Sequence, residues 1–146
     1  MKKLFVSLCL TAAAATVLAS GSSVTGFGGF RDVNEGVATF RLDFSEDALR
    51  SHQFVFAAEG VHKDYPDTVF KSMGVSSYMQ MGNAVMITGT GLIYNETLVN
   101  YMLIVRDNGP RQRDYMEFHA FVDPQFHIIH FAQFLTAGDI VINPGK

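Results

Sequence analysis

The sequence predicts an all-β fold, a single antiparallel β-sandwich or flattened barrel of about eight to nine short strands. Three observations lead to this prediction. Apolar and polar residues alternate with a period of two, most cleanly over residues 37–44. Turn-forming residues separate such stretches at close intervals. No stretch of the sequence shows the longer period of an extended amphipathic helix.

The first nineteen residues are expected to be a secretory signal peptide and not part of the fold. Lys2 and Lys3 form a positive start, residues 4–18 are apolar, and small residues precede a cleavage site after Ala19. The apolar run is short for a membrane span, which needs about 20 residues; a retained N-terminal anchor is the alternative. We therefore expect an exported bacterial protein, secreted, periplasmic or at the cell surface, with residues 20–146 forming one domain.

Packing must hold the mature chain together, because the only cysteine, Cys9, lies in the signal. The chain is thus exported to a compartment that permits disulfides without a cysteine to form one. Thirteen phenylalanines, twelve of them after Ala19, supply apolar surface for a core. Two of the eleven basic residues lie in the signal, so nine basic and fourteen acidic residues remain and the net charge is −5. This acidic balance, without a basic stripe, argues against nucleic acid as a partner.

Nine stretches show strand patterning bounded by turn residues. Glycines crowd the first stretch, where they indicate a bulge or a close approach of neighbouring backbone. The fourth is expected to contain two short strands broken at Met73-Gly74. Residues 83–122 repeat strand, turn and strand most regularly, and the rest of the chain is organised around them. The nine stretches are residues 24–30, 37–44, 52–58, 68–81, 83–94, 98–107, 114–122, 126–134 and 139–143.

The link after the strand 98–107 contains Asp107, Asn108 and Asp114, which are oxygen donors of the kind that calcium prefers. Calcium takes about six to eight oxygens. Asp-Asn-Gly is more commonly turn chemistry, in which the aspartate side chain bonds the backbone two residues on. We interpret the link as a turn, with bound calcium as the alternative.

Three histidines near the end of the chain raise the question of a metal site. A four-residue turn around Asp123-Pro124-Gln125 would place His119 directly across from His130, whereas a three-residue turn would pair it with Ile129. Because successive side chains of a strand point to opposite faces, His127 and His130, which are three residues apart, are expected on opposite faces of the sheet.

Glu117 shares a face with His119 and would be a third ligand. Zinc needs three or four convergent ligands, so we predict no metal and no cofactor, and retain His119, His130 and Glu117 as weak candidates only. The arrangement that we expect instead is an outer face bearing solvated histidines, with one packed against Phe131.

We predict no enzymatic activity and no catalytic residues. The sequence contains neither a Gly-x-Ser-x-Gly nor a His-Glu-x-x-His pattern. The favoured function is an exported module with a binding or structural role, whose partners would be cell-surface or extracellular proteins or glycans. One alternative is a small β-barrel that binds an apolar or carbohydrate ligand at a mouth lined by Phe54, Phe56 and Met86. Another is a metal-dependent enzyme that uses the candidate ligands above.

Four motifs also suggest a family. They are Val24-Thr25-Gly26, Ile87-Thr88-Gly89-Thr90-Gly91, Asp107-Asn108-Gly109-Pro110 with Asp114, and Gly138-Asp139-Ile140-Val141-Ile142. Their order and spacing over residues 24–143 resemble the post-COAP domain, a family of small β domains in exported bacterial proteins, often appended to larger surface proteins.

This chain departs from the post-COAP pattern in two places. The loop between the two aspartates is one residue shorter, with Arg111 and Arg113 where glycines are usual. Val122-Asp123 occupies the position where the family has an aromatic residue followed by aspartate, and the aromatic residue of this chain, Phe121, lies one position earlier. The resemblance implies the β architecture and an exported location, and it brings no catalytic residue with it.

Overall fold

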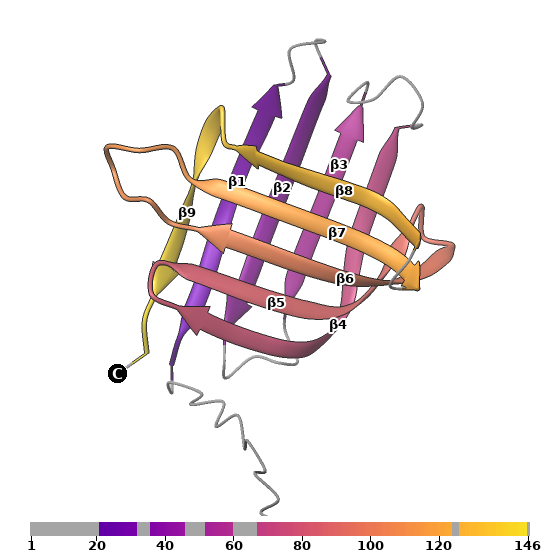
Figure 1. Cartoon of the computed structure of the whole chain (residues 1–146), viewed down its shortest axis with the longest axis horizontal. Coiled ribbons are helices and arrows are strands. Elements are labelled where there is room, and N and C mark those ends of the chain that lie inside the picture. The colour runs from indigo at the N-terminus through magenta and orange to yellow at the C-terminus, as the bar shows by residue number, and fades with distance from the viewer. Residues whose placement is uncertain (1–20, 32–35, 46–51, 60–66, 124–125, 146) are drawn as a thin grey trace, which may run out of the picture.

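Nine strands form one antiparallel sheet in the computed structural model, which describes residues 21–31, 36–45, 52–59, 67–123 and 126–145 (Figure 1). The predicted signal peptide lies outside these residues. The described part contains no helix long and apolar enough to cross a membrane. The strands are β1 (Ser23–Arg31), β2 (Val37–Ser45), β3 (Gln53–Glu59), β4 (Thr68–Met81), β5 (Ala84–Ile93), β6 (Thr97–Arg106), β7 (Tyr115–Asp123), β8 (Phe126–Phe134) and β9 (Ala137–Asn143).

The sheet curls until its two halves face each other. Its strand order is β8-β7-β6-β5-β4-β3-β2-β1-β9, so β8 and β9 stand at the two ends. In Figure 1, β5 to β8 pass in front of β1, β2 and β3 and cross them steeply, and β4 runs from one layer into the other. The predicted all-β class and the flattened barrel or sandwich are therefore confirmed.

The expected break at Met73-Gly74 is wrong, because β4 is one continuous strand of 14 residues. Its register against β5 shifts between Ser72 and Gly74, and again between Val75 and Ser77. A bulge adds a residue to one strand and bends it without ending the pairing. These bulges lie within the strand that joins the two layers of the sheet.

Gly89 in β5 makes room for this bend. A Cβ added at Gly89 would collide with the carbonyl oxygen of Gly74 and would lie 2.9 Å from the ring of Tyr101. Gly28 in β1 has a similar role, since a Cβ there would lie 2.6 Å from the carbonyl oxygen of Ala137. The pairings of β1 show no register shift, so Gly28 serves close approach and not a bulge.

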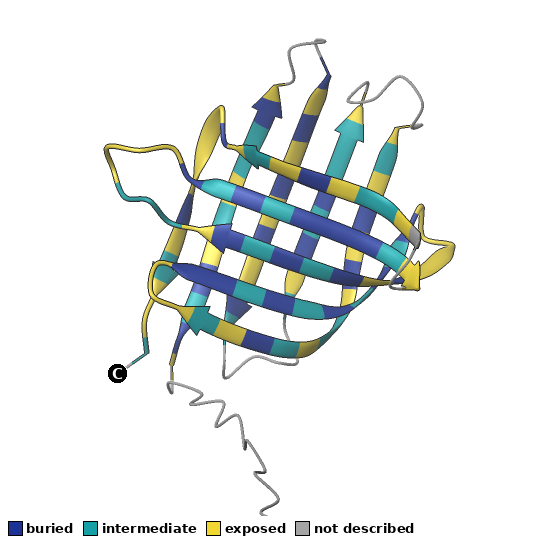
Figure 2. Cartoon of the chain, viewed as in Figure 1, coloured by how far each residue is buried: buried dark blue, intermediate teal, exposed yellow. Residues whose placement is uncertain are grey.

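Interlocking phenylalanine rings fill the space between the two layers. Phe118 on β7 lies at the centre, with its ring centroid 5.0 Å from that of Phe54, 5.1 Å from Phe56 and 4.8 Å from Phe70. All four side chains are at most 1% exposed. Along β5 and β6, buried residues alternate with more exposed ones (Figure 2). The core therefore consists mainly of aromatic rings from one layer packed against rings from the other.

Phe54, Phe56 and Met86, which the alternative barrel would place together at a mouth, do not share a face. Phe54 and Phe56 point into the core, whereas Met86 is half-buried and alternates with the fully buried Val85 and Ile87. A strand directs successive side chains to opposite faces, so Met86 lies on the outer face of β5.

We expect Gly89→Ala to destabilise the fold by about 3 kcal/mol or more, because the clash is with backbone and not with a movable side chain. Gly29→Ala is the matched control in β1, since its Cβ would meet only the carbonyl oxygen of Ala38, at 3.6 Å. Urea unfolding midpoints measure both variants. Equal effects of the two substitutions would contradict this account of the β4 bend.

Candidate functional site

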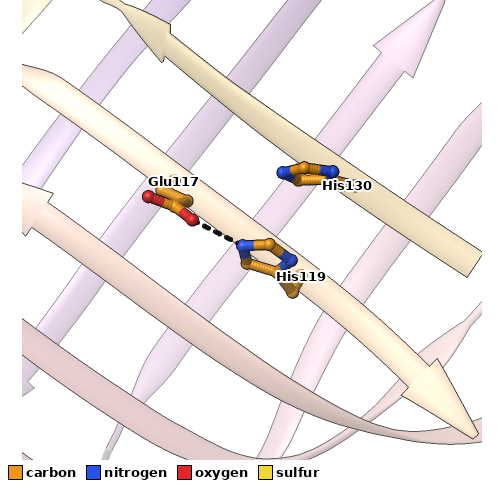
Figure 3. A group of neighbouring side chains, drawn as sticks. All are labelled: Glu117, His119 and His130. Carbon is orange, nitrogen blue, oxygen red and sulfur yellow. Dashed lines mark hydrogen bonds and ion pairs between the residues drawn. The ribbon is translucent and has the colours of Figure 1, made fainter. Parts of the chain in front are cut away.

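Glu117, His119 and His130 form a cluster on the outer face of β7 and β8 (Figure 3). Glu117 and His119 alternate along β7 with Phe118 and Ala120, which are fully buried. Since the buried residues point into the core, the two polar side chains point outward. His119 pairs directly with His130, as the four-residue turn predicts.

The three side chains lie close enough to act together. The Nε2–H of His119 donates to Oε1 of Glu117 at 2.7 Å. The rings of His119 and His130 stack with centroids 4.4 Å apart and an interplanar angle of 21°. One possible ligand atom from each residue lies within 4.8 Å of the other two. The weak candidates from the sequence are therefore brought together.

His127 also belongs to this cluster, so its predicted position on the opposite face from His130 is wrong. The β7–β8 register pairs Ala120 with Ile129 but Phe121 with His127, which leaves Ile128 as an extra residue on β8. Such a bulge reverses the parity of the residues beyond it. As a result, Nδ1 of His127 lies 3.3 Å from Nδ1 of His119.

His119 is only 7% exposed although it faces outward. Its own cluster covers it: His130 stacks on one face, His127 approaches with its ring centroid 5.3 Å away, and Glu117 binds the ring edge. The predicted packing of a histidine on Phe131 is not what buries the ring. Phe131 instead points into the core, 5.2 Å from Phe56.

The cluster holds Glu117 in its ionised form. The hydrogen bond from His119 lowers the pKa of this carboxyl group most, and positive charge on His119 and His130 lowers it further, against the opposing effect of burial. The hydroxyl of Tyr115 also donates to Oε2 of Glu117, at 3.3 Å. An ionised carboxylate beside two imidazoles can share a proton with a ring nitrogen or accept a cation.

The link between β6 and β7 is a turn, as interpreted from the sequence. Oδ1 of Asp107 accepts a hydrogen bond from the amide of Gly109 at 2.9 Å, two residues on, and Gly109 has a φ of 76°. Oδ1 of Asp114 accepts from the amide of Asn108 at 2.8 Å. These bonds are the Asp-Asn-Gly turn chemistry expected there.

The same two aspartates also reach across to β9, which the sequence analysis missed. Oδ2 of Asp114 accepts from the amide of Ile140 at 2.7 Å, and Oδ2 of Asp107 accepts from the amide of Ile142 at 3.3 Å. All four carboxylate oxygens thus accept backbone hydrogen bonds. The turn is therefore a clamp on the edge of β9, and its oxygens are engaged with protein and not arranged around a cation.

No family model, curated protein or solved structure matches the chain. The resemblance to post-COAP domains therefore stays a prediction.

We expect Asp114→Ala to cost about 3 kcal/mol of unfolding free energy, because it leaves the amides of Ile140 and Asn108 without their acceptor. The matched control is the exposed neighbour, Arg113→Ala, which keeps the backbone carbonyl that Asn108 uses. Chemical denaturation compares the two variants. A loss no larger in the aspartate variant than in the control would contradict the clamp.

The pH dependence of stability tests the same region through Asp139. Burial raises the pKa of this carboxyl group, and the nearby carboxylates of Asp114 and Asp107 raise it further. A folded-state pKa above the unfolded value means that stability falls as pH rises from the ordinary aspartate pKa of 3.8 through the raised one.

Asp139→Asn removes this charge, so its melting temperature should exceed that of the wild type at pH 7. The gain should shrink as the pH falls below 3.8, where the wild-type carboxyl is also neutral. Asp43→Asn, on the exposed side of β2, is the control. A gain for Asp139→Asn that is the same at both pH values would contradict the electrostatic cause.

Proposed function

We propose that this chain is an exported bacterial module without enzymatic activity, which has a binding or structural role and works through its outer surface. The observation that carries this proposal is the filled interior. Phe54, Phe56, Phe70 and Phe118 occupy the space in which a ligand-binding barrel would hold its ligand.

The position of the polar groups supports action at the surface. The side chains best able to bind a cation or exchange a proton lie on the outer face of the sheet and not in a pocket between its layers. They are Glu117, His119 and His130. The clamp from Asp107 and Asp114 adds stability at the edge of β9 and has all its oxygens engaged. The phenylalanine core and the aspartate clamp thus serve to stabilise the fold. The outer face of the sheet is therefore the surface that we assign to a partner.

The N-terminal pattern supports export. A positive start, an apolar run and small residues before Ser20 are the three parts of a signal peptide. The resemblance to post-COAP domains agrees with this location. The expected partners remain cell-surface or extracellular proteins or glycans.

Expression of the complete chain in a bacterium tests export. We expect the exported fraction to contain a polypeptide that begins at Ser20, as determined by intact mass and N-terminal sequencing. Lys2→Glu/Lys3→Glu should reduce processing, because the positive start is lost. Full-length chain retained in the cytosol would contradict the proposal.

A thermal-shift screen tests whether the interior is closed to ligands. A ligand at about one hundred times its dissociation constant stabilises a protein by about 2.7 kcal/mol. We expect fatty acids of graded chain length to leave the melting temperature of the mature protein unchanged. A saturable rise that depends on chain length would instead favour the ligand-binding barrel.

A further inference from the structure

Three histidines and one carboxylate converge on a single patch from two strands. Glu117 and His119 come from β7, and His127 and His130 come from β8. The bulge at Ile128 is what turns His127 toward the others, since regular pairing would direct it to the opposite face. A solvated sheet face ordinarily carries polar side chains, but here four that can bind a metal or a proton meet at one patch, so the cluster calls for a chemical account of its own.

The nitrogen and oxygen atoms are arranged as a metal requires, with small adjustments. Nε2 of His119 and Oε1 of Glu117 lie 2.7 Å apart with a proton between them. In a tetrahedral zinc site, with bonds of about 2.0–2.1 Å, two ligand atoms lie about 3.3 Å apart. Replacing the shared proton with a metal ion therefore needs these side chains to separate by only about 0.6 Å.

His130 can supply the third ligand. It is exposed and stacks beside His119, so its ring can rotate to direct a nitrogen at an ion held by Glu117 and His119. Its ligand atom is already within 4.8 Å of theirs. The exposure of His130 also leaves a fourth position open to water or to a group of a partner.

His127 is suited to a supporting role. A histidine that binds metal through one ring nitrogen usually donates its other N–H to a neighbouring acceptor, which fixes the orientation of the ring. Nδ1 of His127 lies 3.3 Å from Nδ1 of His119, on the side of the ring opposite Glu117. It can therefore accept the Nδ1–H of His119 once a metal occupies Nε2.

We propose that Glu117, His119 and His130 form a surface site for one divalent transition-metal ion, with His127 positioning His119. Two imidazoles and a carboxylate suit zinc and copper(II) and not calcium or magnesium, which prefer oxygen ligands. The site goes beyond the proposed function and does not rest on it, because metal binding by the purified protein is measured independently of export and of any other ligand.

The test uses the untagged mature protein, residues 20–146, titrated calorimetrically with zinc chloride and, separately, with calcium chloride. We expect one equivalent of zinc to bind and no saturable calcium binding. His130→Ala should weaken zinc binding at least tenfold while the apo protein keeps its fold, because His130 is exposed and lies outside the core. Glu117→Gln should weaken it similarly through the lost charge. Cobalt(II) should give visible absorption bands that the His130 variant loses.

His52→Ala is the matched control, since His52 lies outside the cluster and stacks on Phe44 with centroids 5.9 Å apart. It should bind zinc as the wild type does. His130→Ala or Glu117→Gln with wild-type affinity would overturn the site. A loss in His52→Ala as large as in His130→Ala would overturn it as well, since binding would then be unspecific.

The positioning role of His127 has its own readout. His127→Gln should keep a stoichiometry of one and lower zinc affinity by about 10–100-fold, the usual effect of removing a partner of a metal-bound histidine. A cobalt spectrum of unchanged band positions would show that the three ligands are retained. Unchanged zinc affinity in this variant would overturn the role assigned to His127.

Discussion

The structure depends on hydrogen bonds that satisfy the backbone amides at the free edge of the curled sheet. Strands β8 and β9 end the sheet order, and an unpaired edge exposes backbone groups that otherwise need water or another strand. Here the carboxylates of Asp107 and Asp114 accept hydrogen bonds from the backbone amides of Ile142 and Ile140, respectively. Side chains from the turn between β6 and β7 thus replace the ladder that would close a complete barrel.

The clamp and the core support each other. Holding β9 against the turn brings the layer of β1 to β3 over that of β6 to β8, and phenylalanine rings from both layers fill the space between them. Because Phe118 and Ala120 must face this core, Glu117 and His119 must face outward on β7. The position of the histidine cluster therefore follows from the packing of the interior.

Strand periodicity predicted the fold class because alternation of apolar residues depends only on neighbours in sequence. The pairing of His119 with His130 could be predicted too, once a turn length was assumed. The bulges in β4 and at Ile128 could not, because an extra residue reverses parity without a residue pattern to mark it. Nor could the clamp, since Asp114 and Ile140 are 26 positions apart. Met86 was misplaced because both sides of β5 look apolar near its start.

Amide hydrogen exchange followed by NMR tests the closing of the β9 edge most directly. In β9 the amides of Ile140 and Ile142 point to the turn and not to β1. Our account predicts that the Ile140 amide exchanges as slowly as amides of the central strands, because a buried carboxylate accepts it. Exchange of Ile140 at the rate of a solvent-exposed edge amide would contradict the account.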